Sequence, residues 1–138
     1  SLKQLAAGDK KVKFLGRISD EELKAYLAAC DIFCFPSVTK NEAFGIALAE
    51  AMSLAKPSVT FTIEGSGVNY VSLNGVTGIE VKNGDVEAYA AAIRKLKEDE
   101  ALREAYGKAA REREQELFTE AAFRRNVRAL LGIEEAGV

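Results

Sequence analysis

Glu50 is the first residue with a clear potential for chemistry, because it is a lone carboxylate in an apolar segment. Between positions 43 and 55 only Glu50 is charged, and apolar residues occupy almost every side of the helix predicted at residues 44–54. Such a helix is expected to be buried, and a buried carboxylate is costly without a partner. Two interpretations stay open: Glu50 forms an ion pair or a hydrogen bond to the backbone, or it faces a cleft and binds a ligand such as a ribose.

Glu42 lies eight residues before Glu50, just ahead of the same predicted helix. Eight steps of about 100° leave two helical residues about 80° apart, so both carboxylates can face one groove. The free backbone N–H groups of Ala43, Phe44 and Gly45, together with the helix dipole, predict an anion site that needs no basic side chain. A first-turn glutamate that only interacts with the dipole explains Glu42 equally well.

Two more candidates follow predicted strands. Gly65, Ser66 and Gly67 come soon after a strand predicted at residues 58–62, and glycines at the carboxyl end of a parallel strand let a ligand approach the backbone. A plain tight turn is the more common explanation of such a sequence. Arg17 follows a strand predicted at residues 11–15, where it could meet a base or a phosphate, although an exposed loop arginine is equally ordinary.

The composition excludes several kinds of chemistry. The 138 residues contain no histidine, which excludes imidazole bases, nucleophiles paired with histidine and histidine-ligated metals. A net charge of −2 provides no global basic field for nucleic acid or an anionic bilayer. Cys30 and Cys34 fit neither a redox pair nor a zinc site, so we expect buried thiols in a reducing, cytoplasmic compartment. No apolar run is long enough to span a bilayer, so any membrane association would be peripheral.

Alternating strands and helices position these residues. Strand patterns occupy four segments, residues 11–15, 32–35, 58–62 and 78–81. The wholly apolar run among them, at 32–35, is expected to be buried on both faces. Four residues can cap helices that follow them: Ser19, Asp85, Asp99 and Thr119. This order predicts an α/β fold with a Rossmann-like, doubly wound parallel sheet in one domain of residues 1–138.

Taken together, these segments resemble a known protein family. The strings that carry the likeness are FLGRIS, AACDIFCFPS, NEAFGIALAEAM, GSGVNYVSLNGVTGIEV, NGDVEAYAAAI and FTEAAFRRNVRALL. In order and spacing they resemble the C-terminal, donor-nucleotide-binding domain of retaining GT-B glycosyltransferases. The similar family, glycosyltransferase family 4-like, includes bacterial lipopolysaccharide and exopolysaccharide mannosyl-, rhamnosyl-, galactosyl- and glucosyltransferases. The resemblance covers nearly the whole chain.

The resemblance implies a role for each matching residue. It makes Glu42 the catalytic residue, in contact with hydroxyls of the donor sugar, and it places Glu50 on the ribose. Other donor-binding residues would be backbone amides at the helix start and residues beside the base: Phe44, Gly45, Ile46, Arg17 and Ile18. Gly65, Ser66 and Gly67 stay candidates from their position alone. The implied reaction transfers a hexose from a UDP-, GDP- or ADP-sugar to an acceptor hydroxyl with retention, without a metal ion or other cofactor.

The resemblance also implies missing parts. Relatives carry a first strand with a glycine-rich turn, an Arg and a Lys that grip the diphosphate, and an N-terminal acceptor-binding domain, and this sequence contains none of them. We therefore expect a fragment or separately made domain, inactive alone, whose final helix at residues 119–131 packs toward the missing domain. The absent strand is expected between residues 11–15 and 58–62, so that the chain self-associates or accepts a strand from elsewhere.

Alternative functions and the location follow from the same resemblance. The main alternative is a non-catalytic nucleotide-sugar-binding module that acts only with a second chain. A related epimerase is the least supported reading, because this sequence offers no histidine for one. The full-length protein is expected in the cytoplasm without a nucleic-acid partner, with peripheral attachment at the inner face of the membrane left open.

Overall fold

A computed structural model describes residues 2–39 and 46–132 of the protein. Within these ranges, one parallel sheet contains three strands, which are, in their order across the sheet, β1 (Phe33–Phe35), β2 (Ser58–Phe61) and β3 (Gly78–Val81). Phe33 of β1 lies opposite Ser58 of β2, and Ser58 lies opposite Gly78 of β3. Three of the four predicted strands are therefore confirmed.

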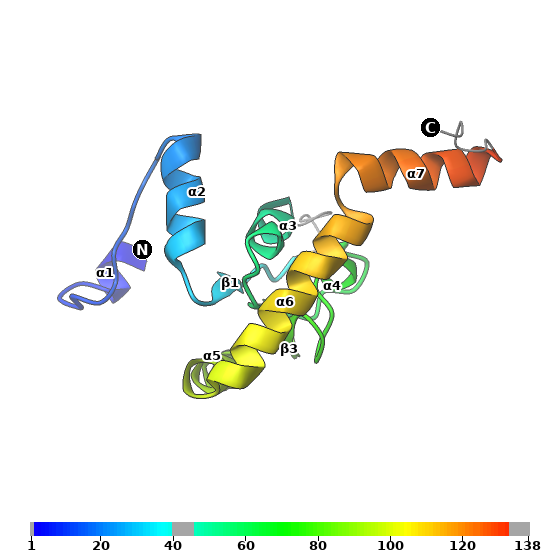
Figure 1. Ribbon diagram of the computed structural model, residues 1–138. Helices are drawn as coiled ribbons and strands as arrows, with labels where there is room; N and C mark the ends of the chain where they lie inside the picture. Colours follow the sequence, from blue (N-terminus) through cyan, green and yellow to red (C-terminus); the bar gives the residue numbers. More distant parts are fainter. Residues whose placement is uncertain (1, 40–45, 133–138) are drawn as a thin grey trace.

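Helices cover both faces of the sheet (Figure 1). The described helices are α1 (Leu2–Leu5), α2 (Asp20–Ala29), α3 (Ile46–Ser53), α4 (Val68–Val71), α5 (Val86–Glu98), α6 (Glu100–Leu117) and α7 (Glu120–Leu131). On one face, α3, α4 and α6 enclose a cluster that includes Leu48 and Met52. On the other face, α5 packs on β2 through Val59, Tyr89 and Leu96. The predicted α/β fold with a doubly wound parallel sheet is confirmed.

The predicted capping residues explain where four helices begin. Each cap side chain accepts a hydrogen bond from the backbone N–H three residues later, at 3.2 Å for Ser19, 2.9 Å for Asp85, 3.0 Å for Asp99 and 3.1 Å for Thr119. These bonds satisfy N–H groups that have no partner inside the helix. The short helix α4 was not predicted from the sequence.

α6 passes very close to the turn that follows α3. A Cβ atom on Gly107 would lie 2.3 Å from the backbone oxygen of Ala55, so only glycine fits at this crossing. The close approach lets α6 cover α3 and brings Ala110 into the same cluster as Leu48. α6 therefore packs against α3, the helix that carries Glu50, and holds it in place.

The predicted strand at residues 11–15 is wrong. These residues form an extended, irregular segment, and Val12 and Phe14 are each 46% exposed. A strand needs a neighbour to pair with, and both positions beside β2 are already occupied by β1 and β3. The expectation that an absent strand lies directly beside residues 58–62 is therefore also wrong, and β1 and β3 are the two edge strands of the sheet among the described residues.

The expectation of full burial around β1 is wrong as well. Cys34, on the edge strand β1, is exposed, and Cys30, at the end of α2, is half-buried. Phe33 and Phe35, on the opposite face of β1, pack against the cluster beneath α3. The protein atoms around each thiol still raise the pKa of Cys30 and of Cys34 through burial.

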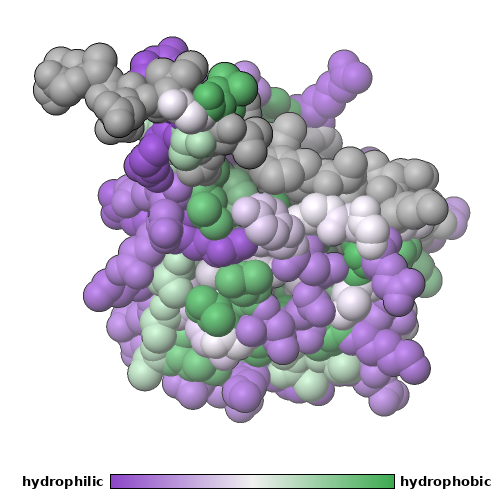
Figure 2. All heavy atoms as spheres, turned by 90° about the vertical axis from the view of Figure 1, so that its right-hand side faces the viewer, coloured by the Kyte–Doolittle hydropathy of each residue, from purple (hydrophilic) through white to green (hydrophobic). Residues whose placement is uncertain are grey.

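The C-terminal helix α7 contacts α6 and extends away from the sheet (Figure 1). Leu131 at its end is 65% exposed, and the predicted packing of this helix toward another domain stays a prediction. Figure 2 shows the face toward which α7 points, where hydrophobic residues form small separate groups among hydrophilic ones. In the described ranges, no helix combines the length and apolar character needed to cross a membrane.

Candidate functional site

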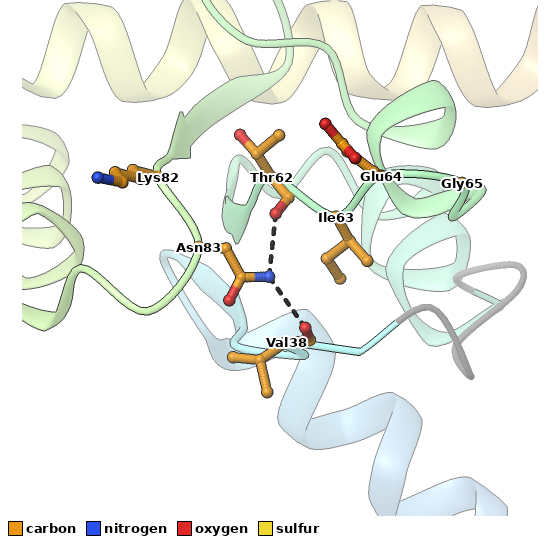
Figure 3. A pocket seen from close by; sticks show the side chains of 7 residues that line it. All are labelled: Val38, Thr62, Ile63, Glu64, Gly65, Lys82 and Asn83. Atoms are coloured by element: carbon orange, nitrogen blue, oxygen red, sulfur yellow. Dashed lines mark hydrogen bonds between the residues drawn. The ribbon is translucent and has the colours of Figure 1, made fainter.

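The carboxyl ends of all three strands meet at one cavity. Because the strands are parallel, the segments that leave β1, β2 and β3 emerge at the same edge of the sheet. They enclose an open cavity of about 970 Å³. Its lining residues, drawn in Figure 3, are Val38, Thr62, Ile63, Glu64, Gly65, Lys82 and Asn83. Open α/β sheets bind ligands at this edge, so the cavity is the leading candidate site.

The glycine loop lies at this edge, as predicted. Gly65 lines the cavity with a φ of 75°, in the left-handed region that favours glycine. No described atom comes within 4 Å of the place that a Gly65 Cβ would take, so a ligand can approach the backbone there. The segment is also a tight turn, in which Ser66 N–H donates to the Ile63 carbonyl at 3.2 Å. The tight turn is therefore confirmed, and the approach of a ligand to this loop stays a prediction.

Asn69 fixes the floor of this loop. Its Oδ1 accepts from the Ile63 N–H at 2.8 Å, and its Nδ2 donates to the Phe61 carbonyl at 3.0 Å. Ser66 Oγ accepts from the Val68 N–H at 3.2 Å, which joins the loop to the start of α4 just after Gly67. The loop is thus held by side chains on its far side, and its backbone stays open toward the cavity.

Glu50 lies on the outer face of α3, and the expectation that it is buried is wrong. α3 turns Leu48, Ala51 and Met52 toward the sheet and leaves Glu50 exposed. The apolar sequence did not reveal this open face, because an alanine-rich helix can be apolar without being covered on every side. Among the described residues Glu50 forms no ion pair, which removes the ion-pair part of the first interpretation for this part of the chain, and its contact with a ribose stays a prediction.

A second, smaller cavity places Glu50 opposite α2. Its volume is about 180 Å³, and its lining residues are Lys24, Leu27, Glu50, Ser53 and Leu54. The α2 wall is held in place by Lys56, whose Nζ donates to the Ala28 carbonyl at 2.8 Å near the end of that helix. A lysine at this position also interacts favourably with the helix dipole. The structure therefore brings Glu50 between α3 and α2.

Arg17 and Ile18 precede α2 and line neither cavity. Arg17 is exposed and Ile18 is half-buried, directly before the cap residue Ser19. Their predicted place beside a base is consistent with the position of α2 next to Glu50, and it stays a prediction.

Three predicted site residues lie outside the described residues: Glu42, Phe44 and Gly45. Ile46 begins α3, and nothing is described of its side chain. Because α3 connects the carboxyl end of β1 with the amino end of β2, this helix start lies at the same edge of the sheet as the cavity. The predicted anion site at the helix start stays a prediction with a consistent location.

Sequence reasoning missed Asn83, Val38 and Lys82. The sequence contained a signal for two of them, because Lys82 and Asn83 directly follow the strand predicted at residues 78–81. The glycine loop was selected for the same reason, since it follows a predicted strand. In Figure 3 the Asn83 amide points between Thr62 and Val38, whereas the Lys82 side chain points away from them. Within the described ranges, no group of three or more His, Cys, Asp or Glu side chains could hold a metal ion.

Comparison with known proteins identifies the family. The family model described as "Glycosyl transferases group 1" matches residues 2–113. The chain belongs to this family. Among curated members, it is 38% identical over 114 residues to the D-rhamnosyltransferase WbpZ of Pseudomonas aeruginosa, which covers 83% of this chain and 30% of the relative. It is 32% identical over 112 residues to the O-antigen chain mannosyltransferase C of Escherichia coli, covering 81% and 30%.

Solved structures of glycosyltransferases share the fold of this group 1 chain. A sucrose-phosphate synthase from Thermosynechococcus elongatus superposes with a TM-score of 0.79 and 30% identity, over 95% of this chain and 33% of that one. HepE of Anabaena in complex with UDP-glucose gives 0.78 and 25%, over 94% and 34%. The chain thus spans about a third of the length of the relatives it matches.

Proposed function

We propose that this chain is the donor-binding domain of a retaining glycosyltransferase in polysaccharide or glycoconjugate biosynthesis. The observation that carries the proposal is the cavity at the carboxyl edge of the sheet, where Gly65 presents an open backbone between the ends of the three strands. Membership of the glycosyl transferases group 1 family and the UDP-glucose held by the solved structure of HepE support the same ligand class. The donor is then a nucleoside diphosphate sugar, and UDP-glucose is the first one to test.

In the proposed reaction, a hexose passes from the donor to an acceptor hydroxyl with retention at the anomeric carbon. Glu42 acts at the donor sugar, and Glu50 accepts hydrogen bonds from the ribose hydroxyls beside α2. The amides of Phe44, Gly45 and Ile46 stabilise the departing diphosphate through the N–H groups at the helix start, without a metal ion. Arg17 and Ile18 lie beside the base in this arrangement.

The proposal places the acceptor on a second domain. The match covers only 30% of the D-rhamnosyltransferase WbpZ, so this relative is long enough to contain such a domain. The open edge of β1 and the exposed Val12 and Phe14 offer a surface on which further chain can pack. This observation also favours the second candidate function, a non-catalytic nucleotide-sugar-binding module that acts with a second chain. We place the whole protein in the cytoplasm, with peripheral attachment at the inner face of the membrane and no nucleic-acid partner.

A pair of glycines provides a controlled test of the donor site. Gly65 and Gly75 both have a φ of 75° and open space at the Cβ position, but Gly65 lines the cavity and Gly75 lies in the turn before β3, at the opposite edge. Gly65→Ala and Gly75→Ala therefore add the same backbone strain. We expect Gly65→Ala to weaken UDP-glucose binding about tenfold, because a methyl group blocks close approach to the backbone. Gly75→Ala should bind as the wild-type chain does.

The measurement is an NMR titration of residues 1–138 with UDP-glucose, GDP-mannose and ADP-glucose in separate series. Amide signals of Gly65, Ser66 and Gly67 should move, together with those around Glu50. If the shifts are confined to α5, α6 and α7, or if both glycine variants bind equally, the donor site lies elsewhere. Product analysis with an acceptor domain present separates the two functions. A retaining transferase yields a product with the donor's anomeric configuration, whereas a non-catalytic module yields no product.

A further inference from the structure

Asn83 connects the segments that leave all three strands at the cavity. Its Nδ2 donates to the Val38 carbonyl at 2.9 Å and to the Thr62 carbonyl at 3.1 Å. Val38 follows β1, Thr62 follows β2, and Asn83 itself follows β3. Figure 3 shows the amide lying between the two carbonyl groups. One side chain therefore spans the full width of the sheet at the edge where the cavity opens.

The segment around Val38 is held by fewer hydrogen bonds than the segment around Thr62. Toward the described residues, positions 37–39 form no other hydrogen bond, and the Val38 side chain is exposed. Thr62, by contrast, is also held by its own N–H, which donates to the Val81 carbonyl at 2.8 Å. Without the Asn83 amide, the segment after β1 would keep its covalent connection to β1 but lose its tie to the rest of the cavity.

We propose that Asn83 is a positioning residue of the donor site, which holds the segment after β1 at a fixed distance from the segment after β2. This inference rests on the proposed function, since the cavity it shapes is the proposed donor site. An asparagine suits the task because its amide nitrogen carries two N–H donors, one for each carbonyl. An aspartate of the same shape has none, and it would set a carboxylate against two carbonyl oxygens.

Asn74 provides the matched control at the opposite edge of the sheet. Its Oδ1 accepts from the Glu80 N–H at 2.9 Å, so this asparagine uses its oxygen where Asn83 uses its nitrogen. Asn74→Asp keeps an acceptor and its hydrogen bond, whereas Asn83→Asp removes both donors. The two variants carry the same added charge. Asn83→Ser, which keeps one donor on a shorter side chain, separates loss of the hydrogen bonds from repulsion between charges.

The test measures carbonyl ¹³C shifts of Val38 and Thr62, and then the dissociation constant for UDP-glucose by NMR titration of residues 1–138. We expect Asn83→Asp to move both carbonyl signals upfield and to weaken binding about fivefold to tenfold, as two lost hydrogen bonds predict. Asn83→Ser should weaken binding about threefold, and Asn74→Asp should change neither quantity. Because the titration follows signals of folded molecules, a variant that is only less stable keeps the wild-type dissociation constant.

Three results would overturn the inference: unchanged carbonyl shifts in Asn83→Asp, equal binding by Asn83→Asp and the wild-type chain, or weaker binding in Asn83→Asp alone with Asn83→Ser unaffected. The last result would assign the effect to charge. If the wild-type chain does not bind UDP-glucose, the proposed function fails instead, and the carbonyl shifts alone decide whether Asn83 holds the two segments.

Discussion

Leu48 and Leu23 both belong to helices with apolar residues at helical spacing, yet Leu48 has no exposed surface and Leu23 is 40% exposed. The difference separates two regions: residues 2–31, called here the N-terminal part, and residues 46–122, called here the body. In the N-terminal part Leu27 is buried, but Leu5, Val12 and Phe14 are well exposed. In the body, two clusters of buried apolar side chains lie on the two faces of the sheet, although Val86 and Tyr70 stay exposed. Similar sequence patterns thus give packing only where a partner surface exists.

Few contacts attach this N-terminal part to the body. Lys56 Nζ binds the Ala28 carbonyl at 2.8 Å, and Leu27 packs beside α3 at the smaller cavity. The extended segment at residues 11–15 has no strand beside it in the described ranges. Since the proposed ribose contact of Glu50 faces α2, the shape of that part of the site depends on the less firmly held region.

The largest expected contrast is in amide hydrogen exchange. In the described ranges, residues 13–15 donate no backbone hydrogen bond, whereas Val59 lies in the centre of the paired strand β2. We expect Leu15 to exchange within about tenfold of an unstructured peptide and Val59 at least about a thousandfold more slowly, since core amides open only with global unfolding. Mass spectrometry or NMR exchange of residues 1–138 measures both. Strong protection of Leu15 would show that the segment pairs with a neighbouring chain.

A matched pair of leucine substitutions tests the same contrast through stability. Leu48→Ala removes a fully buried side chain beneath α6 and should lower the free energy of unfolding by about 2 to 5 kcal/mol. Leu23→Ala makes the same chemical change on α2, where 40% of the side chain is already exposed, and should cost less than about 1 kcal/mol. Urea unfolding measures the two values. Equal costs would mean that α2 is covered in solution.

The sequence predicted the elements of the body other than α4 because each has a local signal that the tertiary structure reinforces. Strands at 58–62 and 78–81 are flanked by turns, and Asp85 and Asp99 cap helices through hydrogen bonds within one turn. The strand at 11–15 failed because alternation shows what a strand could bury, not whether a neighbouring strand is present.

The site residues also fall into two groups, those that a local sequence rule predicts and those whose surroundings depend on the folded chain. The place of Gly65 followed from a general rule about parallel sheets and was confirmed. The exposure of Glu50 depends on which side of α3 is covered, and no local pattern shows this. The same rule about parallel sheets would have placed Asn83 at this edge, but its hydrogen bond to Val38, 45 positions earlier, exists only in the folded chain.

Removing the Lys56 contact should loosen α2 without unfolding the body. Lys56→Met keeps the apolar stem but loses the hydrogen bond to Ala28 and the interaction with the helix end, worth about 1 kcal/mol. We expect exchange in α2 to become about fivefold faster, with β2 unchanged. Lys97→Met, at an exposed position of α5, is the control. If Lys56→Met makes exchange faster in both α2 and α5, or in neither helix, Lys56 is not the residue that attaches α2 to the body.

The smallest expected effect concerns Cys34, which lies on β1, the edge strand that pairs with β2 of the body. Its side chain is exposed, but burial raises the pKa of its thiol above the ordinary value near 9. The thiolate is the form that reacts with iodoacetamide, so a raised pKa leaves less of it at pH 8. In a Cys30→Ser background, alkylation of Cys34 should be a few times slower than that of a free cysteine peptide, and the rate should keep rising as the pH passes 9. Urea should abolish the difference, because unfolding returns the pKa to its ordinary value. A native rate equal to that of the peptide would mean that the Cys34 side of β1 is fully solvated, which would contradict the expectation.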